Sequence, residues 1–238
     1  MLCNWIRSFQ KSIVKTNTNT SNLASFRDLK RALGWLGMVL PAICILGGLF
    51  PGHNLNGLWV QPSISHYYHT NMRDVLVGLL GCVAILFMTY SGYGWVDDVI
   101  TWAIGVAGTG FIIFPGPTYP PSDGPAGILQ LTQSTSGTVH LWSSFAFFFL
   151  LAVNSIVLFT LTNKGEKEEL GQPKIVRNAI YIASGGVILA SLLTLGLIDH
   201  FAQHFFDNSS IGLIFETVML LAFGVSWLVK GGFAPLRD

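Results

Sequence analysis

Six long apolar runs decide what this chain can fold into. A helix needs about 20 apolar residues to cross ~30 Å of hydrocarbon, and each run is close to that length. The runs lack the alternation of apolar and polar residues that marks a membrane β-barrel. Since only helices and closed barrels satisfy the backbone in lipid, the sequence predicts an all-α polytopic membrane protein with six transmembrane helices. The runs cover residues 32–50, 75–92, 99–114, 139–162, 179–198 and 211–229.

The composition agrees with a lipid-buried chain. Charged residues make up 11% of it and hydrophobic residues 51%, whereas a soluble domain carries about 25% charged residues. The net charge of +1 argues against a nucleic-acid partner, because phosphates would require a basic patch. The three cysteines have neither metal-site nor disulfide spacing.

The basic residues predict the orientation. Of the thirteen Lys and Arg residues, only Arg73 falls on the side opposite the two termini. Because positive charge stays on the cytosolic side, we expect both termini in the cytosol of a bacterial inner membrane. The expected organisation is a polar basic tail over residues 1–31, a six-helix domain over 32–230 and a short tail over 231–238.

On this topology all six histidines fall on the non-cytosolic face. The pair at 200 and 204 has the i,i+4 spacing that presents two imidazoles to one metal ion on a helix. With the other histidines, one face holds enough nitrogen ligands for zinc or another transition metal. The structural alternative for His140 is hydrogen bonding at the lipid headgroup level, and that for the pair at 200 and 204 is an exposed loop. The histidines are His53, His66, His69, His140, His200 and His204.

The polar segment 63–74 directly precedes the second apolar run. In a structural interpretation, Thr70 or Asn71 caps the helix, Asp74 complements the helix dipole and Arg73 reaches lipid phosphates. In a functional interpretation, the same segment forms one wall of a site.

Glu216 and His140 also allow both a structural and a functional interpretation. Glu216 lies about five residues into the last run, ~8 Å below its start. Its carboxylate either pairs with Arg73 or forms the floor of an outward pocket. His140 opens the fourth run, and Ser144 lies one turn below it on the same face.

The layout resembles the six-helix DRAM-type and GPI-lipid-remodelling superfamily and its bacterial relatives. The shared plan comprises Ile64-Ser65, Arg73, a Gly-rich third helix, His140 and Glu216. This resemblance implies an outward or lumenal pocket and a connection to lipids, without one agreed reaction.

A second resemblance is to the ceramidase and adiponectin-receptor superfamily of intramembrane zinc hydrolases. It is carried by Ser65-x-x-x-His69 and His200-x-x-x-His204, and it implies zinc. This superfamily also requires an aspartate on the same membrane side. The nearest candidates in this chain, Asp97 and Asp98, lie on the opposite side.

These observations favour an outward pocket that handles a lipid or lipid-linked headgroup, with a metal as an open alternative. The expected catalytic residues are His69, His140, Glu216 and Asp74, the substrate contacts Ser65, Tyr68 and Arg73, and the metal ligands His66, His69, His140, His200 and His204. The alternatives are a non-catalytic sensor or structural subunit, with a protein partner or a second copy, and a small-solute or proton-coupled transporter that uses the glutamate as its proton site.

Overall fold

The computed structural model describes residues 18–50, 59–92, 94–118, 124–161, 172–207 and 209–233. Within these ranges the chain is all-helical, as predicted, and the one pairing of extended backbone is an isolated bridge between Ala126 and Leu131. The helices are α2 (Thr18–Gly48), the 3₁₀ helix η1 (Ser65–His69), α3 (Arg73–Thr89), α4 (Trp95–Ile113), α5 (Gln133–Val153), the π-helical turn η2 (Asn154–Leu158), α6 (Gln172–Asp207) and α7 (Ile211–Lys230).

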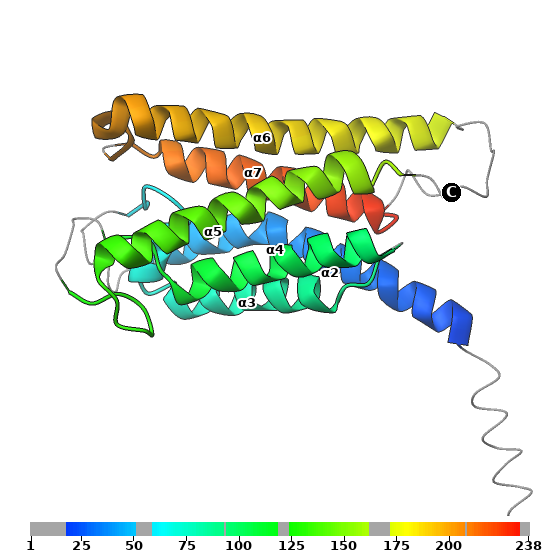
Figure 1. The fold of residues 1–238 in the computed structure, drawn as a ribbon, viewed down its shortest axis with the longest axis horizontal. Helices are drawn as coiled ribbons and strands as arrows, with labels where there is room; N and C mark the ends of the chain where they lie inside the picture. Colours follow the sequence, from blue (N-terminus) through cyan, green and yellow to red (C-terminus); the bar gives the residue numbers. More distant parts are fainter. Residues whose placement is uncertain are drawn as a thin grey trace, which may run out of the picture.

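The six long helices form a closed ring. Each packs against its neighbours in the chain, and α7 packs against α2 to close the ring. Figure 1 shows that η1, the start of α5, the end of α6 and the start of α7 all lie at one end of the bundle, whereas the start of α2 lies toward the other end. The ring therefore gathers segments from distant parts of the sequence at a single end.

Helices long and apolar enough to cross a membrane make up most of this fold. The described residues contain five such segments: Ser25–Gly48, Trp95–Ile113, Gln133–Leu158, Lys174–Asp199 and Ile211–Lys230. The remaining helix, α3, has 17 residues, at the lower limit for a spanning helix. Large apolar side chains such as Ile85 and Leu193 are 62% and 68% exposed on the outside of the bundle. Such a surface suits lipid rather than water.

The helices extend beyond the apolar runs in three places. Helix α2 starts at Thr18, inside the segment that we expected as a polar tail. Helix α5 starts at Gln133, so His140 lies about two turns inside it and does not open it. The predicted helices at 179–198 and 211–229 leave His200 and His204 in the connection between them. That placement was wrong, because α6 continues to Asp207. Hydropathy locates the lipid-crossing part of a helix, but polar residues with good helix propensity extend the helix past it.

Glycines set the close contact between α2 and α7. A Cβ atom on Gly34 would lie 2.9 Å from the carbonyl oxygen of Gly224, and one on Gly224 would lie 2.7 Å from that of Gly34. Small residues let two backbones approach in this way, which is a common basis of helix packing in membranes. This contact fixes the position of α7, and hence of Glu216.

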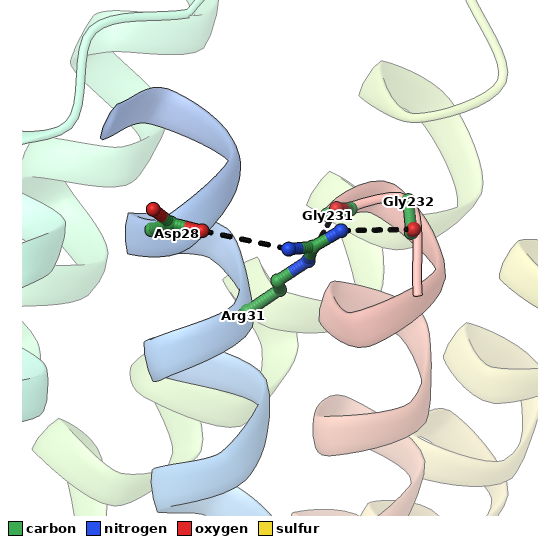
Figure 2. A network of polar contacts seen from close by, with 4 residues as sticks. All are labelled: Asp28, Arg31, Gly231 and Gly232. Carbon is green, nitrogen blue, oxygen red and sulfur yellow. Dashed lines mark hydrogen bonds and ion pairs between the residues drawn. The ribbon is translucent and has the colours of Figure 1, made fainter. Parts of the chain in front are cut away.

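An arginine on α2 caps the C-terminal end of α7 (Figure 2). The Arg31 side chain donates from Nε to the carbonyl oxygen of Gly231 at 2.9 Å and from Nη2 to that of Gly232 at 3.1 Å. Its Nη1 lies 3.5 Å from Oδ1 of Asp28. A cation at a helix C-terminus meets the unpaired carbonyls and the negative end of the dipole. This network locks the two helices together at the end opposite η1.

A cluster of buried apolar side chains lies at the η1 end of the bundle and supports the site. Tyr67 of η1 is fully buried there, among Leu40, Cys44 and Leu213. A Cβ on Gly48 would lie 2.6 Å from the Tyr67 ring, so η1 sits directly on the end of α2. The tyrosine thus anchors the short helix that carries Ser65 and His69.

Candidate functional site

A cavity of about 60 Å³ opens at the η1 end of the ring. In this measure one water needs about 10–15 Å³, so the cavity has room for only a few heavy atoms. Residues of α2, α3, α4, α5, α7 and η1 line it, and most of them are apolar. The polar lining residues are Ser65, Tyr68, His140, Ser144 and Glu216.

The structure brings Ser65 and His140 together in this cavity. Oγ of Ser65 lies 3.0 Å from Nε2 of His140. The other ring nitrogen, Nδ1, lies 2.9 Å from the carbonyl oxygen of Phe114 and 3.2 Å from that of Phe111. Carbonyl oxygens only accept, so Nδ1 carries a hydrogen. In the neutral imidazole, this tautomer leaves Nε2 as an acceptor for the Ser65 hydroxyl.

The local sequence explains why His140 adopts this orientation. Helix α4 ends before Pro115, because proline cannot continue the hydrogen-bond pattern, and its last carbonyls lack helical partners. Two residues one turn apart on α5 bind this end of α4: His140 meets the carbonyls of Phe111 and Phe114, and Ser136 donates to that of Pro115 at 2.8 Å. The imidazole is therefore held on one side by backbone and turned toward the cavity on the other.

Glu216 fixes the other side of the site. Its Oε2 accepts a hydrogen bond of 2.6 Å from the backbone N–H of Ile64, and the backbone N–H of Ser65 also bonds to this carboxylate. A carboxylate at the start of a helix satisfies the first unpaired amides. The backbone N–H of Leu213 bonds to the carbonyl of Pro62 at 2.7 Å, so α7 holds the segment before η1 at two points.

Arg73 does not pair with Glu216, and that structural alternative was wrong. Instead, Nη2 of Arg73 lies 3.4 Å from the hydroxyl oxygen of Tyr68, and the guanidinium lies 4.9 Å from the centre of the Tyr68 ring. Tyr68 lines the cavity, whereas Arg73 and Asp74 are exposed at the start of α3. The arginine thus stands outside the cavity, joined to it through the tyrosine.

The residues expected to cap α3 have other roles. The residue at the N-cap position is Met72, whose side chain makes no capping bond. Thr70 accepts from the backbone N–H of Met72 at 3.1 Å, and Asn71 donates to the carbonyl of Gly47 at 3.3 Å. These contacts hold the connection between η1 and α3 rather than the first turn of the helix.

His66 and His69 lie beside the site and are not among the residues that line this cavity. Nδ1 of His66 lies 2.6 Å from Oγ of Ser63, and Nε2 of His69 donates to the carbonyl of Gly116 at 2.9 Å. Burial, together with the nearby His69 and His140, lowers the pKa of His66 to about 4. Burial also lowers the pKa of His69. Both histidines therefore fold in their neutral form.

The metal-site hypothesis receives no support from the part of the chain that the structure describes. These residues contain no group of three or more His, Cys, Asp or Glu side chains that could hold a metal ion. The side chains of His200 and His204, and all of His53, lie outside the described residues. Zinc binding by this histidine set stays a prediction.

Sequence reasoning named Ser65, His140 and Glu216 but missed what binds each of them. It assigned Ser65 a substrate contact and did not foresee its bond to His140 across 75 residues. It also missed the backbone partners, which are the carbonyls at the end of α4 and the amides at the start of η1. The Phe114-Pro-Gly-Pro turn was the available signal, since it marks a helix end that needs a hydrogen-bond donor.

Comparisons with protein-family models, with curated proteins and with solved structures returned no match for this chain.

Proposed function

We propose that the chain is a six-span membrane protein with both termini in the cytosol of a bacterial inner membrane. The five spanning segments and the 17-residue α3 support this count, since spans of about 17 residues are known. The distribution of basic residues supports the orientation. On this topology the cavity faces the non-cytosolic leaflet.

The function that we propose is handling of a lipid or a lipid-linked headgroup at that leaflet. One observation carries the proposal: the small cavity is apolar except for a polar group formed by Ser65, His140 and Glu216, with Tyr68 and Ser144 beside it. A site that binds a molecule with an apolar body and one polar group has this division. The resemblance to the DRAM-type and GPI-lipid-remodelling superfamily points the same way and is itself part of the proposal.

The size of the cavity determines which part of the lipid can enter it. The cavity of about 60 Å³ admits roughly one polar linkage and the first carbons of its chains. The rest of the lipid must lie along the outside of the bundle, where apolar side chains face the membrane. Arg73, exposed beside Tyr68, is placed to meet a headgroup phosphate, which a guanidinium binds well.

Photo-crosslinking tests this function. Membranes that contain the protein are loaded with a diacyl phospholipid that carries a diazirine near its ester linkage, and the cross-linked peptides are mapped by mass spectrometry. We expect adducts on η1, α3 and α5 around the cavity. Val77→Trp fills the cavity, because Val77 lines it, and should lower cross-linking at these sites at least tenfold.

The matched control lies on the same helix. Ile85→Trp adds the same side chain at a position that is 62% exposed on the outside of α3, and it should leave the cavity adducts unchanged. Adducts scattered evenly over the lipid-facing surface, or a cavity signal that both variants lower equally, would contradict the proposal.

A further inference from the structure

We infer that Ser65 and His140 form a nucleophile and general base that cleave an oxygen ester of a membrane lipid. This inference rests on the proposed function, because it assigns the reaction that occurs on the bound lipid. It follows from the way in which the two side chains are held and from the space in front of them.

The pair has the geometry of an activated serine. The Oγ to Nε2 distance of 3.0 Å lies within the range in which a base accepts a serine proton. Such a dyad needs a third group that binds Nδ1–H and fixes the tautomer. Here the carbonyl oxygens of Phe111 and Phe114 serve this purpose, since a neutral carbonyl also fixes the tautomer and orientation of the ring, although without the charge of a carboxylate.

A purely structural role for His140 explains only half of these contacts. As a cap for the end of α4 it requires Nδ1 alone. Nothing in that role requires Nε2 to point at a hydroxyl on another element, 75 residues away, inside a cavity. A buried structural histidine more often meets backbone or water at both nitrogens, whereas here one nitrogen meets a hydroxyl that lines open space.

The rest of the site holds the serine still. Glu216 binds the backbone amides of Ile64 and Ser65, so the start of η1 cannot shift relative to α7. Tyr68, on the same short helix as Ser65, and Ser144, one turn from His140 on α5, contribute the other hydroxyl groups of the lining. These hydroxyl groups are the side-chain donors that the cavity lining offers to an oxyanion beside the Ser65–His140 pair.

The reaction balances with water as the second substrate. Oγ of Ser65 attacks the ester carbonyl carbon while its proton moves to Nε2 of His140. The tetrahedral intermediate collapses with cleavage of the bond between the carbonyl carbon and the alcohol oxygen, and the imidazolium protonates the departing alcohol. Water then attacks the carbonyl carbon of the acyl-serine and passes a proton to Nε2. The second tetrahedral intermediate collapses with cleavage of the bond between the carbonyl carbon and Oγ, and the imidazolium returns its proton to Oγ, which releases the carboxylic acid and restores Ser65.

Two fluorophosphonates test the inference in the full-length, detergent-solubilised protein, one with a hexadecyl chain and one with two isopropyl groups. An activated serine attacks phosphorus and expels fluoride, which leaves an adduct that mass spectrometry can assign to a residue. We expect a single adduct on Ser65. Ser65→Ala should abolish it, and His140→Gln should slow it at least about 100-fold, the usual contribution of a general base.

Ser134→Ala is the control, because Ser134 is exposed on α5 and takes no part in the site. The melting temperature, compared with that of the parent protein, verifies that each variant is folded. Where Ser65→Ala or His140→Gln fails this check, Ser65→Cys replaces it. At pH 6, iodoacetamide should alkylate the cysteine introduced at residue 65 faster than it alkylates Cys82, an exposed native thiol.

The outcomes separate the two proposals. Lipid cross-linking in the cavity without a Ser65 adduct overturns the dyad and leaves lipid handling intact. A Ser65 adduct with the diisopropyl probe, in protein that shows no lipid cross-link, keeps the dyad and contradicts lipid handling. Adducts on other serines, or equal labelling of His140→Gln and the parent protein, would also overturn the inference.

Discussion

Oγ of Ser65 and Nε2 of His140 lie 3.0 Å apart and join η1 to α5 within the cavity. This contact brings together two residues that the sequence separates by 75 positions, and it depends on three elements at once. The end of α4 orients the imidazole, α7 holds the backbone of the serine through Glu216, and η1 presents the hydroxyl. Each support gives an independent test of the site.

Removing the Glu216 carboxylate should release η1 from α7. In Glu216→Leu the amides of Ile64 and Ser65 lose their acceptor, and unpaired buried groups cost about 1–3 kcal/mol. Glu216→Gln keeps one acceptor oxygen and should recover part of this loss. We expect the melting temperature in detergent to be highest for the parent protein, lower for Glu216→Gln and lowest for Glu216→Leu. Equal melting temperatures for the Gln and Leu variants would show that the amide contacts do not stabilise the fold.

Acid should destabilise the fold through His66 and His69. Their pKa values are lowered in the folded state, that of His66 to about 4, whereas an unfolded histidine titrates near 6.5. Below pH 6.5 the unfolded chain therefore binds more protons than the folded chain. The stability that is present above pH 6.5 is lost as the pH falls toward 4. His66 contributes up to about 1.4 kcal/mol per pH unit in this window, and His69 acts in the same direction.

Unfolding measured between pH 7 and pH 4 checks this expectation. His66→Gln removes one titrating group and should flatten the profile, and the amide can still bond to Oγ of Ser63, the partner of the imidazole. The histidines that face His66 from other positions are His69 and His140, so part of the slope should persist. A stability that rises on acidification would contradict the assignment of neutral histidines.

Adding a methyl group between α2 and α7 should disturb the bundle. In Gly224→Ala the new Cβ would lie 2.7 Å from the carbonyl oxygen of Gly34 and still closer to a side-chain carbon of Met38. Overpacking of this kind costs about 1–3 kcal/mol. The control is Gly78→Ala on α3, where the same methyl meets nothing within 4 Å. Similar melting temperatures for the two variants would show that the helices separate easily.

Thiol labelling in intact cells tests the orientation. In a background without native cysteines, Gln130→Cys lies in the connection before α5, and Ser91→Cys lies in the connection between α3 and α4. We expect a membrane-impermeant maleimide to label the first variant in intact cells and the second only after permeabilisation. The reverse pattern would place the cavity at the cytosolic leaflet.

The fold class and the general place of the site could be predicted from the sequence. Unbroken apolar runs leave helices as the only way to satisfy the backbone in lipid, and so the all-α bundle followed. Segregation of the histidines from the lysines and arginines pointed to one end of that bundle. The cavity at this end contains Ser65, Tyr68, His140 and Glu216, four of the residues that the sequence singled out.

The pairings within the site were beyond the sequence, for a physical reason. Charge complementarity made Arg73 one of two alternatives for Glu216, but the carboxylate binds the backbone at the start of η1. Backbone groups are identical at every residue, so no sequence pattern marks which of them will meet a given side chain. The predicted helix ends were wrong for a related reason. Hydropathy indicates which residues contact lipid, but it does not indicate where the backbone hydrogen bonds of a helix end.

The protonation pattern of His140 tests the central claim most directly. Nitrogen-15 NMR of the protein with labelled histidine, at neutral pH, distinguishes a ring nitrogen that carries hydrogen from one that does not. The account predicts hydrogen on Nδ1 and a bare Nε2 whose resonance moves in Ser65→Ala and not in Ser134→Ala. A protonated Nε2, or an Nε2 resonance that is indifferent to Ser65→Ala, would contradict it.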